Sequence, residues 1–143
     1  MYLFNRLSSV ETIEIKPIIA KEILESLQTK IEEEKQVIVH CCFPASPYLG
    51  NLIRIWPSTY LIDEITGHKS NLIHTENISM FPSWTTVPFM QDFWFTLIFS
   101  GLPGDCKSFD LKEVIPEEGG FYVKAIKRNS LDVYRVKISE SYS

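Results

Sequence analysis

The fold is decided by residues 93–111, FWFTLIFSGLPGDCKSFDL, which open with the most strongly apolar run of the chain. Every second position of that run carries a large apolar side chain: Phe93, Phe95, Leu97 and Phe99. Alternate side chains of an extended chain point to the same face, and here only this face is uniformly apolar. The pattern predicts a central β-strand.

A turn follows directly after this strand. Pro103 lacks an amide donor, and Gly101 and Gly104 accept positive φ, so the run cannot continue as a strand. Alternation of apolar and polar side chains resumes at Phe109 and Leu111. The stretch therefore predicts a strand, a tight connection and a second strand.

Length and composition predict one domain. A chain of 143 residues can bury roughly two-thirds of its unfolded surface without metals or disulfides. An apolar fraction of 45% excludes disorder, and a charged fraction of 22% is ordinary for a globular protein. We expect a single domain over residues 1–143, with a strand and a helix in residues 1–36 and a β-sandwich core in residues 37–143.

The charge of the chain disfavours nucleic acid and anionic membranes as partners. Its formal net charge is −4, whereas binding to either polyanion needs clustered Lys and Arg. One local exception is the segment from Gly120 to Ser143, whose basic residues outnumber Asp132 and Glu140. These basic residues are Lys124, Lys127, Arg128, Arg135 and Lys137. We interpret them as the solvated faces of the last two strands.

Cysteine usage and the absence of targeting signals predict a cytoplasmic protein. The N-terminus has no signal-peptide pattern, and no run approaches the ~18 to 20 apolar residues that a membrane helix needs. The three cysteines, Cys41, Cys42 and Cys106, are odd in number, and two are adjacent. This suits reduced thiols better than a disulfide framework.

One helix is predicted, near the N-terminus. Residues 12–16 alternate and predict an edge strand at most. Pro17 ends it and suits the first turn of a helix, and apolar residues then recur at helical spacing through residue 34. They are Ile19, Ile23, Leu27 and Ile31, flanked by Ala20 and Leu24.

After the helix the apolar period changes from 3.6 to 2, which predicts roughly eight short strands. The strands are expected at residues 37–43, 52–56, 60–63, 71–78, 93–100, 109–111, 121–126 and 133–138. Asn129 and Ser130 are expected to close a hairpin between the last two. Because a parallel sheet would need a helix after almost every strand, the pattern favours a mainly β, antiparallel two-sheet sandwich. A partly closed β-barrel is the alternative, since periodicity does not distinguish closure from two packed sheets.

The C-terminal part of the chain resembles a protein family. The order of its segments is Glu76 to Ile78, Thr96 to Pro103, Ser108 to Glu113, GGFYVKAI (119–126) and DVYRVKI (132–138). It resembles small uncharacterised bacterial proteins with immunoglobulin-like or telokin-like sandwiches, over about the last hundred residues. Their Leu-Pro turn and short Phe-x-Leu strand resemble Leu102-Pro103 and residues 109–111. The resemblance implies an antiparallel immunoglobulin-like β-sandwich that serves in adhesion or interaction, and the N-terminal helix lies outside the pattern.

Metal binding and cofactors are not expected. His40 and Cys42 share one face of a predicted strand, which places two zinc ligands together. Structural zinc normally needs four ligands in paired units, and the others would have to come from His68, His74, Cys106 or Asp105. We therefore expect buried structural thiols and no bound cofactor.

A complete catalytic constellation is also missing from the sequence. Cys106, in a turn, and His74 are the residues that a small cysteine-dependent hydrolase or thiol enzyme would use. Nothing in the sequence supplies a lowered thiol pKa or an oxyanion hole. The adjacent carboxylates Asp63-Glu64 and Glu117-Glu118 diverge on an extended chain, so paired acid and base chemistry is not expected from them.

The candidate binding residues are aromatic side chains beside proline-containing connections: Trp84, Phe81, Phe89, Trp56 and Tyr60. Trp and Tyr are enriched where one side of a surface is apolar and the other wet. For Trp84, packing in the core and exposure as a platform both remain open. We expect a non-catalytic protein-interaction or self-association module, which recognises a protein partner or forms a homodimer through a strand edge or the loop from Pro82 to Pro88.

Overall fold

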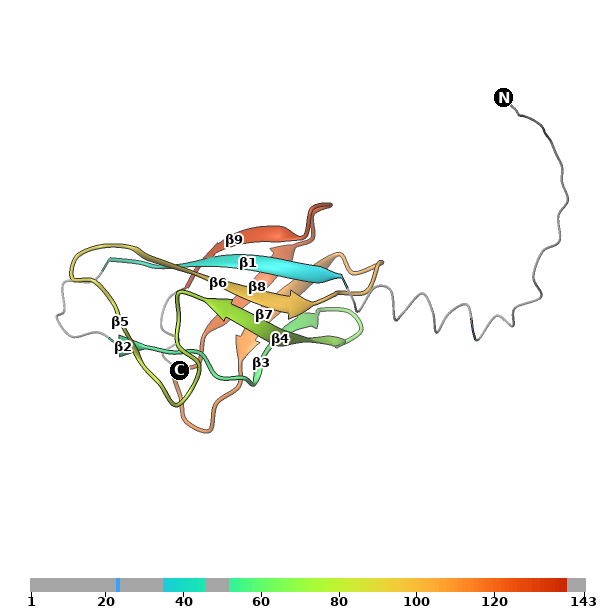
Figure 1. The fold of residues 1–143 in the computed structure, drawn as a ribbon. Coiled ribbons are helices and arrows are strands. Elements are labelled where there is room, and N and C mark those ends of the chain that lie inside the picture. The colour runs from blue at the N-terminus through green and yellow to red at the C-terminus, as the bar shows by residue number, and fades with distance from the viewer. Residues whose placement is uncertain (1–22, 24–34, 46–51, 139–143) are drawn as a thin grey trace, which may run out of the picture.

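A computed structural model of the chain describes residues 23, 35–45 and 52–138. Nine strands occupy most of the described part (Figure 1). They are β1 (Gln36–Phe43), β2 (Leu52–Ile53), β3 (Thr59–Asp63), β4 (Lys69–Glu76), β5 (Thr85–Thr86), β6 (Phe93–Ser100), β7 (Ser108–Glu113), β8 (Tyr122–Lys127) and β9 (Val133–Lys137). The predicted mainly β class is confirmed.

Seven of the strands form one sheet, and two form a small separate ribbon. The order in the large sheet is β8-β7-β3-β4-β6-β1-β9, and β2 pairs with β5. All neighbours in the large sheet are antiparallel except β1 and β9, which run parallel. The prediction of a purely antiparallel sheet is wrong at this one pair.

The connection between β8 and β9 requires the sheet to curl. A flat sheet of seven strands would hold its edge strands about 29 Å apart, at about 4.8 Å per strand. Residues 128–132, which join the two edge strands, can bridge at most about 20 Å. The sheet is accordingly nearly closed and barrel-like. The parallel pair also fits this shape, because an odd number of strands cannot alternate in direction all the way around a barrel.

This architecture corresponds to the predicted alternative, a partly closed barrel, and the two-sheet immunoglobulin-like sandwich is not confirmed. The predicted hairpin at Asn129 and Ser130 is wrong. The two strands that flank it are the opposite edges of the sheet, where β8 pairs with β7 and β9 pairs with β1. A turn signal marks a reversal of the chain, and pairing across it depends on contacts elsewhere in the fold.

The core lies against β6, as the sequence predicts. This strand sits between β4 and β1, and Phe95, Leu97 and Phe99 are buried. Partners from the neighbouring strands repeat the pattern, since Val39 stands opposite Leu97 and Val37 opposite Phe99. Both valines are fully buried, so the inner face of the curled sheet forms the core.

The predicted N-terminal strand (12–16) and helix (17–34) lie outside the described residues, apart from Ile23. Ile23 is helical and its side chain is exposed. Within the described residues, no helix has the length and apolar character that crossing a membrane requires.

Candidate functional site

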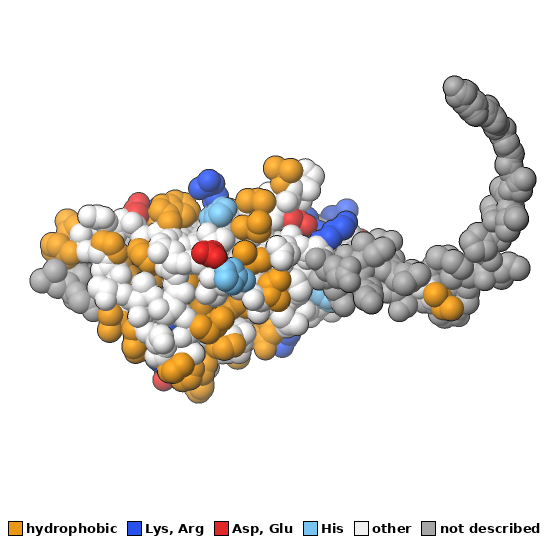
Figure 2. Space-filling view, in the orientation of Figure 1, with side chains coloured by type: hydrophobic (Ala, Val, Ile, Leu, Met, Phe, Trp, Pro, Cys, Tyr) orange, Lys and Arg blue, Asp and Glu red, His pale blue; other side chains and the backbone are white. Residues whose placement is uncertain are grey.

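Exposed apolar side chains are spread over the described surface and do not by themselves single out a site. On the face shown in Figure 2, orange hydrophobic side chains are interspersed with white backbone and other side chains. The exposed aromatic residues include Phe81, Trp84, Phe89 and Trp94. Scattered exposed apolar residues are normal, so a site must be identified from side chains that converge.

Side chains converge where the segment after β2 meets the loop between β4 and β5. Ile55 forms a parallel bridge to Met80, the Ile55 amide donates to Ser79 O at 2.9 Å, and the Phe81 amide donates to Ile55 O at 2.8 Å. Ile53 and Ile55 are buried, so the alternation of an extended chain turns Arg54 and Trp56 away from the core. The bridge therefore brings these two residues beside the β4–β5 loop.

The guanidinium group of Arg54 lies among three aromatic rings. Its Cζ is 3.8 Å from the ring centroid of Trp84, 4.5 Å from that of Phe81 and 5.8 Å from that of Trp56. Trp56 and Phe81 stack on each other with centroids 3.9 Å apart. We call these four residues the arginine–aromatic platform. Cation–π contacts with several rings hold the guanidinium in one position.

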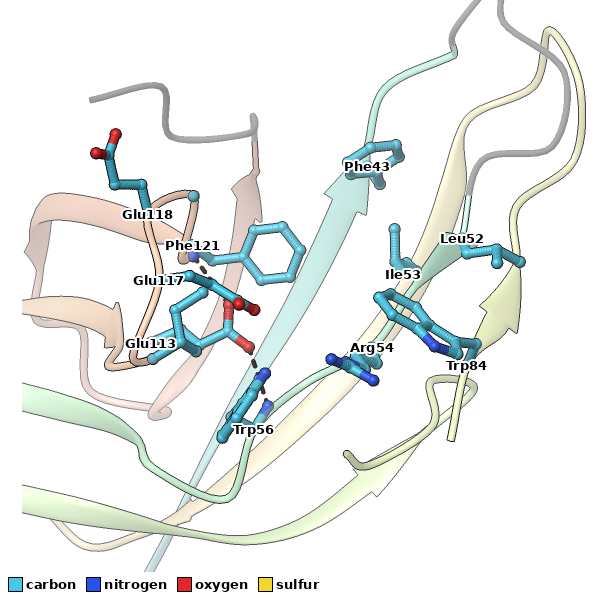
Figure 3. A pocket seen from close by; sticks show the side chains of 12 residues that line it. Phe43, Leu52, Ile53, Arg54, Trp56, Trp84, Glu113, Glu117, Glu118 and Phe121 are labelled. Atoms are coloured by element: carbon cyan, nitrogen blue, oxygen red, sulfur yellow. Dashed lines mark hydrogen bonds between the residues drawn. The ribbon is translucent and has the colours of Figure 1, made fainter. Parts of the chain in front are cut away.

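A pocket of about 220 Å³ opens beside the platform (Figure 3). Its lining residues are Phe43, Leu52, Ile53, Arg54, Trp56, Trp84, Glu113, Ile115, Glu117, Glu118, Gly119 and Phe121. Glu117 and Glu118 come from the β7–β8 connection and stand on the opposite side of the pocket from Arg54 and Trp84. The pocket is thus apolar and aromatic over much of its wall, with charged groups at two sides.

Glu113, the last residue of β7, forms part of the pocket wall and is buried. Its carboxylate accepts the Trp56 amide at 2.9 Å and the Phe121 amide at 3.0 Å. Burial raises the pKa of Glu113, and the two amide hydrogen bonds and the positive charge of Arg54 offset part of this effect. Glu113 therefore fixes the backbone at both Trp56 and Phe121, which positions one side of the platform.

The structure brings three of the predicted binding residues together and separates the other two. Trp56, Phe81 and Trp84 belong to the platform, and Trp84 keeps 52% of its surface exposed. Phe89 is exposed in the connection before β6 and does not line the pocket. Tyr60 lies on β3, where the Lys69 ammonium is 5.1 Å from its ring.

Two residues of the site were missed in the sequence analysis. Arg54 is recognisable there only as the polar position between Leu52 and Trp56 in a predicted strand. Glu113 ends a short alternating segment, and nothing nearby signals that its carboxylate is buried. Both roles depend on contacts between distant segments, so local patterns could not reveal them.

The residues considered for catalysis or metal binding do not converge. The Cys106 thiol is buried and donates to Ser108 O at 3.4 Å, and burial, followed by the charge of Asp63, raises its pKa. The His74 imidazole pairs with Glu76, and His40 Nδ1 is 2.8 Å from Thr96 Oγ1. Among the described residues, no three His, Cys, Asp or Glu side chains are grouped as metal ligands. All three cysteines are free and buried.

Comparison with protein families, curated proteins and solved structures gives no match for this chain. The resemblance to bacterial immunoglobulin-like proteins therefore stays a prediction.

Proposed function

We propose that this protein is a non-catalytic, cytoplasmic protein-interaction module, and that its partner binds on the arginine–aromatic platform. The observation that carries the proposal is the position of Arg54 between Trp84 and Phe81, beside a pocket and with half of Trp84 exposed. Trp and Arg dominate the residues that contribute most to protein–protein binding. The immunoglobulin-like resemblance supports the same class, since such domains serve in adhesion or interaction.

The platform is suited to binding because its side chains are already ordered. Arg54 donates one hydrogen bond, from Nη1 to Pro82 O at 3.2 Å, and forms no ion pair within the described residues. Most of its five N–H donors therefore stay available to a partner's carbonyl or carboxylate. Because ring contacts already restrict the guanidinium, binding costs less side-chain entropy.

The pocket gives the partner a second contact. Phe43, Ile53 and Phe121 form an apolar part of its lining, and Glu113 has both carboxylate oxygens bonded to backbone amides. An apolar side chain of the partner can enter here without leaving the Glu113 carboxylate unpaired. A second copy of the chain is the simplest partner, since two-fold dimers are the commonest soluble oligomers.

The experiment compares Trp84→Ala with Phe89→Ala, which removes a similarly exposed aromatic ring outside the platform. Self-association is measured by sedimentation over a concentration series, and partner binding by quantitative affinity capture with each variant as bait. We expect Trp84→Ala to weaken the association at least tenfold, as for an aromatic side chain that dominates binding, and Phe89→Ala to change it less than about twofold.

Two outcomes would contradict the proposal. In the first, Trp84→Ala associates as strongly as the unmodified chain. In the second, the Phe89→Ala loss equals the Trp84→Ala loss, which would show that any exposed ring contributes and that the platform has no special role.

A further inference from the structure

The two edge strands of the seven-stranded sheet, β8 and β9, carry basic side chains and no acidic ones. Lys124 and Lys127 on β8 are exposed, as are Arg135 and Lys137 on β9. β8 pairs only with β7, and β9 only with β1, within the described residues. We call the two unpaired edges the seam. The basic residues near the C-terminus thus gather along the two sides of one opening in the sheet.

Some of the apolar side chains that pack against the core at the seam are only partly buried. Val123 and Ile126 on β8 and Val136 on β9 pack against the core but remain only partly buried. The corresponding residues of central strands, such as Val39 and Leu97, are fully buried. Apolar side chains supplied by an added strand would therefore remove further apolar surface from water at this place.

The edges of β8 and β9 differ in how well they can pair with a further strand. The register of β7 and β8 shifts so that Lys124 and Ala125 stand opposite Asp110. Ala125 has φ of 60°, and its amide donates to Asp110 Oδ1 at 2.8 Å. Such a bulge distorts an edge and blocks further pairing. β9 keeps a regular register with β1, from Val133 to Lys137, so its free edge is the one that can accept another strand.

We propose that the free edge of β9 binds an extended segment of a partner protein in which acidic and apolar side chains alternate. The segment adds to β9 through backbone hydrogen bonds. Its acidic side chains lie on the outer face beside Arg135 and Lys137, and its apolar side chains point inward beside Val136. The bound segment becomes the eighth strand and covers the partly buried residues of the seam.

Charge selects this occupant over a second copy of the chain. Two β9 edges that paired about a two-fold axis would bring Arg135 and Lys137 of one copy against the same basic residues of the other. Like charges across a strand pair destabilise it, and lysines on an edge strand commonly prevent such self-pairing. A strand with carboxylates at alternate positions would instead place negative charges beside Arg135 and Lys137, and opposite charges across a strand pair stabilise it.

The test uses the full chain and a short synthetic peptide of alternating glutamate and valine, with binding followed by fluorescence anisotropy at an ionic strength of about 0.15 M, where the Debye length is about 8 Å. In the variant Arg135→Glu with Lys137→Glu, we expect the affinity for this peptide to fall at least tenfold. The same variant should gain affinity for a peptide in which lysine replaces glutamate, which also shows that it is folded. N-methylation of the peptide backbone should abolish binding to the unmodified chain, because ladder hydrogen bonds are lost.

A matched control is Lys69→Glu with Lys112→Glu, which changes the charge equally on β4 and β7, strands that are paired on both sides. It should bind the glutamate peptide within about threefold of the unmodified chain, since distant exposed charges are screened. Trp84→Ala should leave the peptide affinity unchanged, so this inference and the proposed platform are tested separately.

Three results would overturn the inference: no detectable binding at millimolar peptide, equal affinity of the N-methylated peptide, or equal losses in the β9 variant and its control. Slower hydrogen exchange of β9 amides at higher concentration of the Trp84→Ala variant without peptide would also overturn it, because a second copy would then occupy the edge.

Discussion

The fold shifts the pKa values of two buried carboxylates, Asp63 and Glu113, in opposite directions. Burial alone would raise the pKa of Asp63, but hydrogen bonds from Ile65 and Thr66 outweigh it and lower that pKa. The Ile65 amide donates to Asp63 Oδ1 at 2.9 Å. At Glu113 burial outweighs the amide hydrogen bonds, and the pKa is raised. The two residues therefore contribute opposite pH dependences to stability.

The prediction is that Asp63→Asn and Glu113→Gln change the pH profile of stability in opposite directions. The stability from Asp63 is present above its unfolded pKa of about 3.9 and is lost as the pH falls through its lowered folded pKa. The stability from Glu113 is present below its unfolded pKa of about 4.3 and is lost as the pH rises through its raised folded pKa.

Urea unfolding of the unmodified chain and the two variants between about pH 2 and pH 8 measures how the free energy of unfolding depends on pH. Relative to the unmodified chain, Asp63→Asn should lose less stability on acidification, and Glu113→Gln should lose less stability as the pH rises above about 4.3. Parallel profiles for all three proteins would show that neither carboxylate titrates differently in the folded state.

At the scale of single residues, the aromatic side chains of the site were predicted from the sequence, whereas Arg54 and Glu113 were not. Trp56, Phe81 and Trp84 stand out because large rings beside proline-containing connections are unusual in turns. Arg54 has no such signal, because an isolated arginine in a strand is ordinary. Its role arises only when the bridge between Ile55 and Met80 brings the two segments together.

At the scale of elements, β6 is the strand on which the barrel depends. Phe95→Ala and Leu97→Ala should each lower the free energy of unfolding by roughly 2 to 5 kcal/mol, since both side chains are buried between paired strands. The control Ile73→Ala removes an exposed apolar side chain of β4 and should cost less than about 1 kcal/mol. Chemical denaturation measures all three. Losses of under about 1 kcal/mol at Phe95 and Leu97 would contradict the central position of β6.

The length and the apolar pattern of each strand explain why some strands were predicted and others were not. β6 alternates clearly and β1 is a long, largely apolar run, so both strands were located to within a residue. β5 consists of Thr85 and Thr86 only, which is too short for any periodic signal. The pairing of β9 with β1 joins segments at opposite ends of the described chain, and no turn signal at Asn129 or Ser130 carries that information.

At the scale of the whole molecule, the sequence left closure undecided because the inner faces of a barrel and of a sandwich show the same alternation. What decides it is the short connection from β8 to β9, read together with the positions of these strands at opposite edges. Closure also explains the location of the seam, because curling of the sheet brings its two edge strands, β8 and β9, to face each other. Alternation in the sequence locates the strands along the chain, whereas the order of the strands in the sheet determines whether the sheet closes.

The connection that holds the two edges is itself fixed by Arg128. Its Nε and Nη2 donate to the Asp132 carboxylate at 2.6 and 3.0 Å, and its Nη1 donates to Pro103 O at 2.7 Å. Tyr134 donates its hydroxyl to Asp132 as well, at 2.9 Å. The β8–β9 loop is thereby tied to the β6–β7 connection.

The last prediction is that Arg128 and Asp132 act as one unit. Arg128→Met should cost about 1 to 3 kcal/mol of unfolding free energy, because the Pro103 carbonyl loses a charged donor and the largely buried Asp132 carboxylate keeps, among the described residues, only the Tyr134 hydroxyl as a side-chain donor. Asp132→Asn should cost a similar amount, and the double variant should cost less than the sum of the two by about 1 kcal/mol.

The exposed pair of His74 and Glu76 is the control, and His74→Ala should cost less than about 0.5 kcal/mol. If denaturation shows that the Arg128 and Asp132 losses simply add, the loop is held by its backbone alone, and the ion pair does not fix the edges of the barrel.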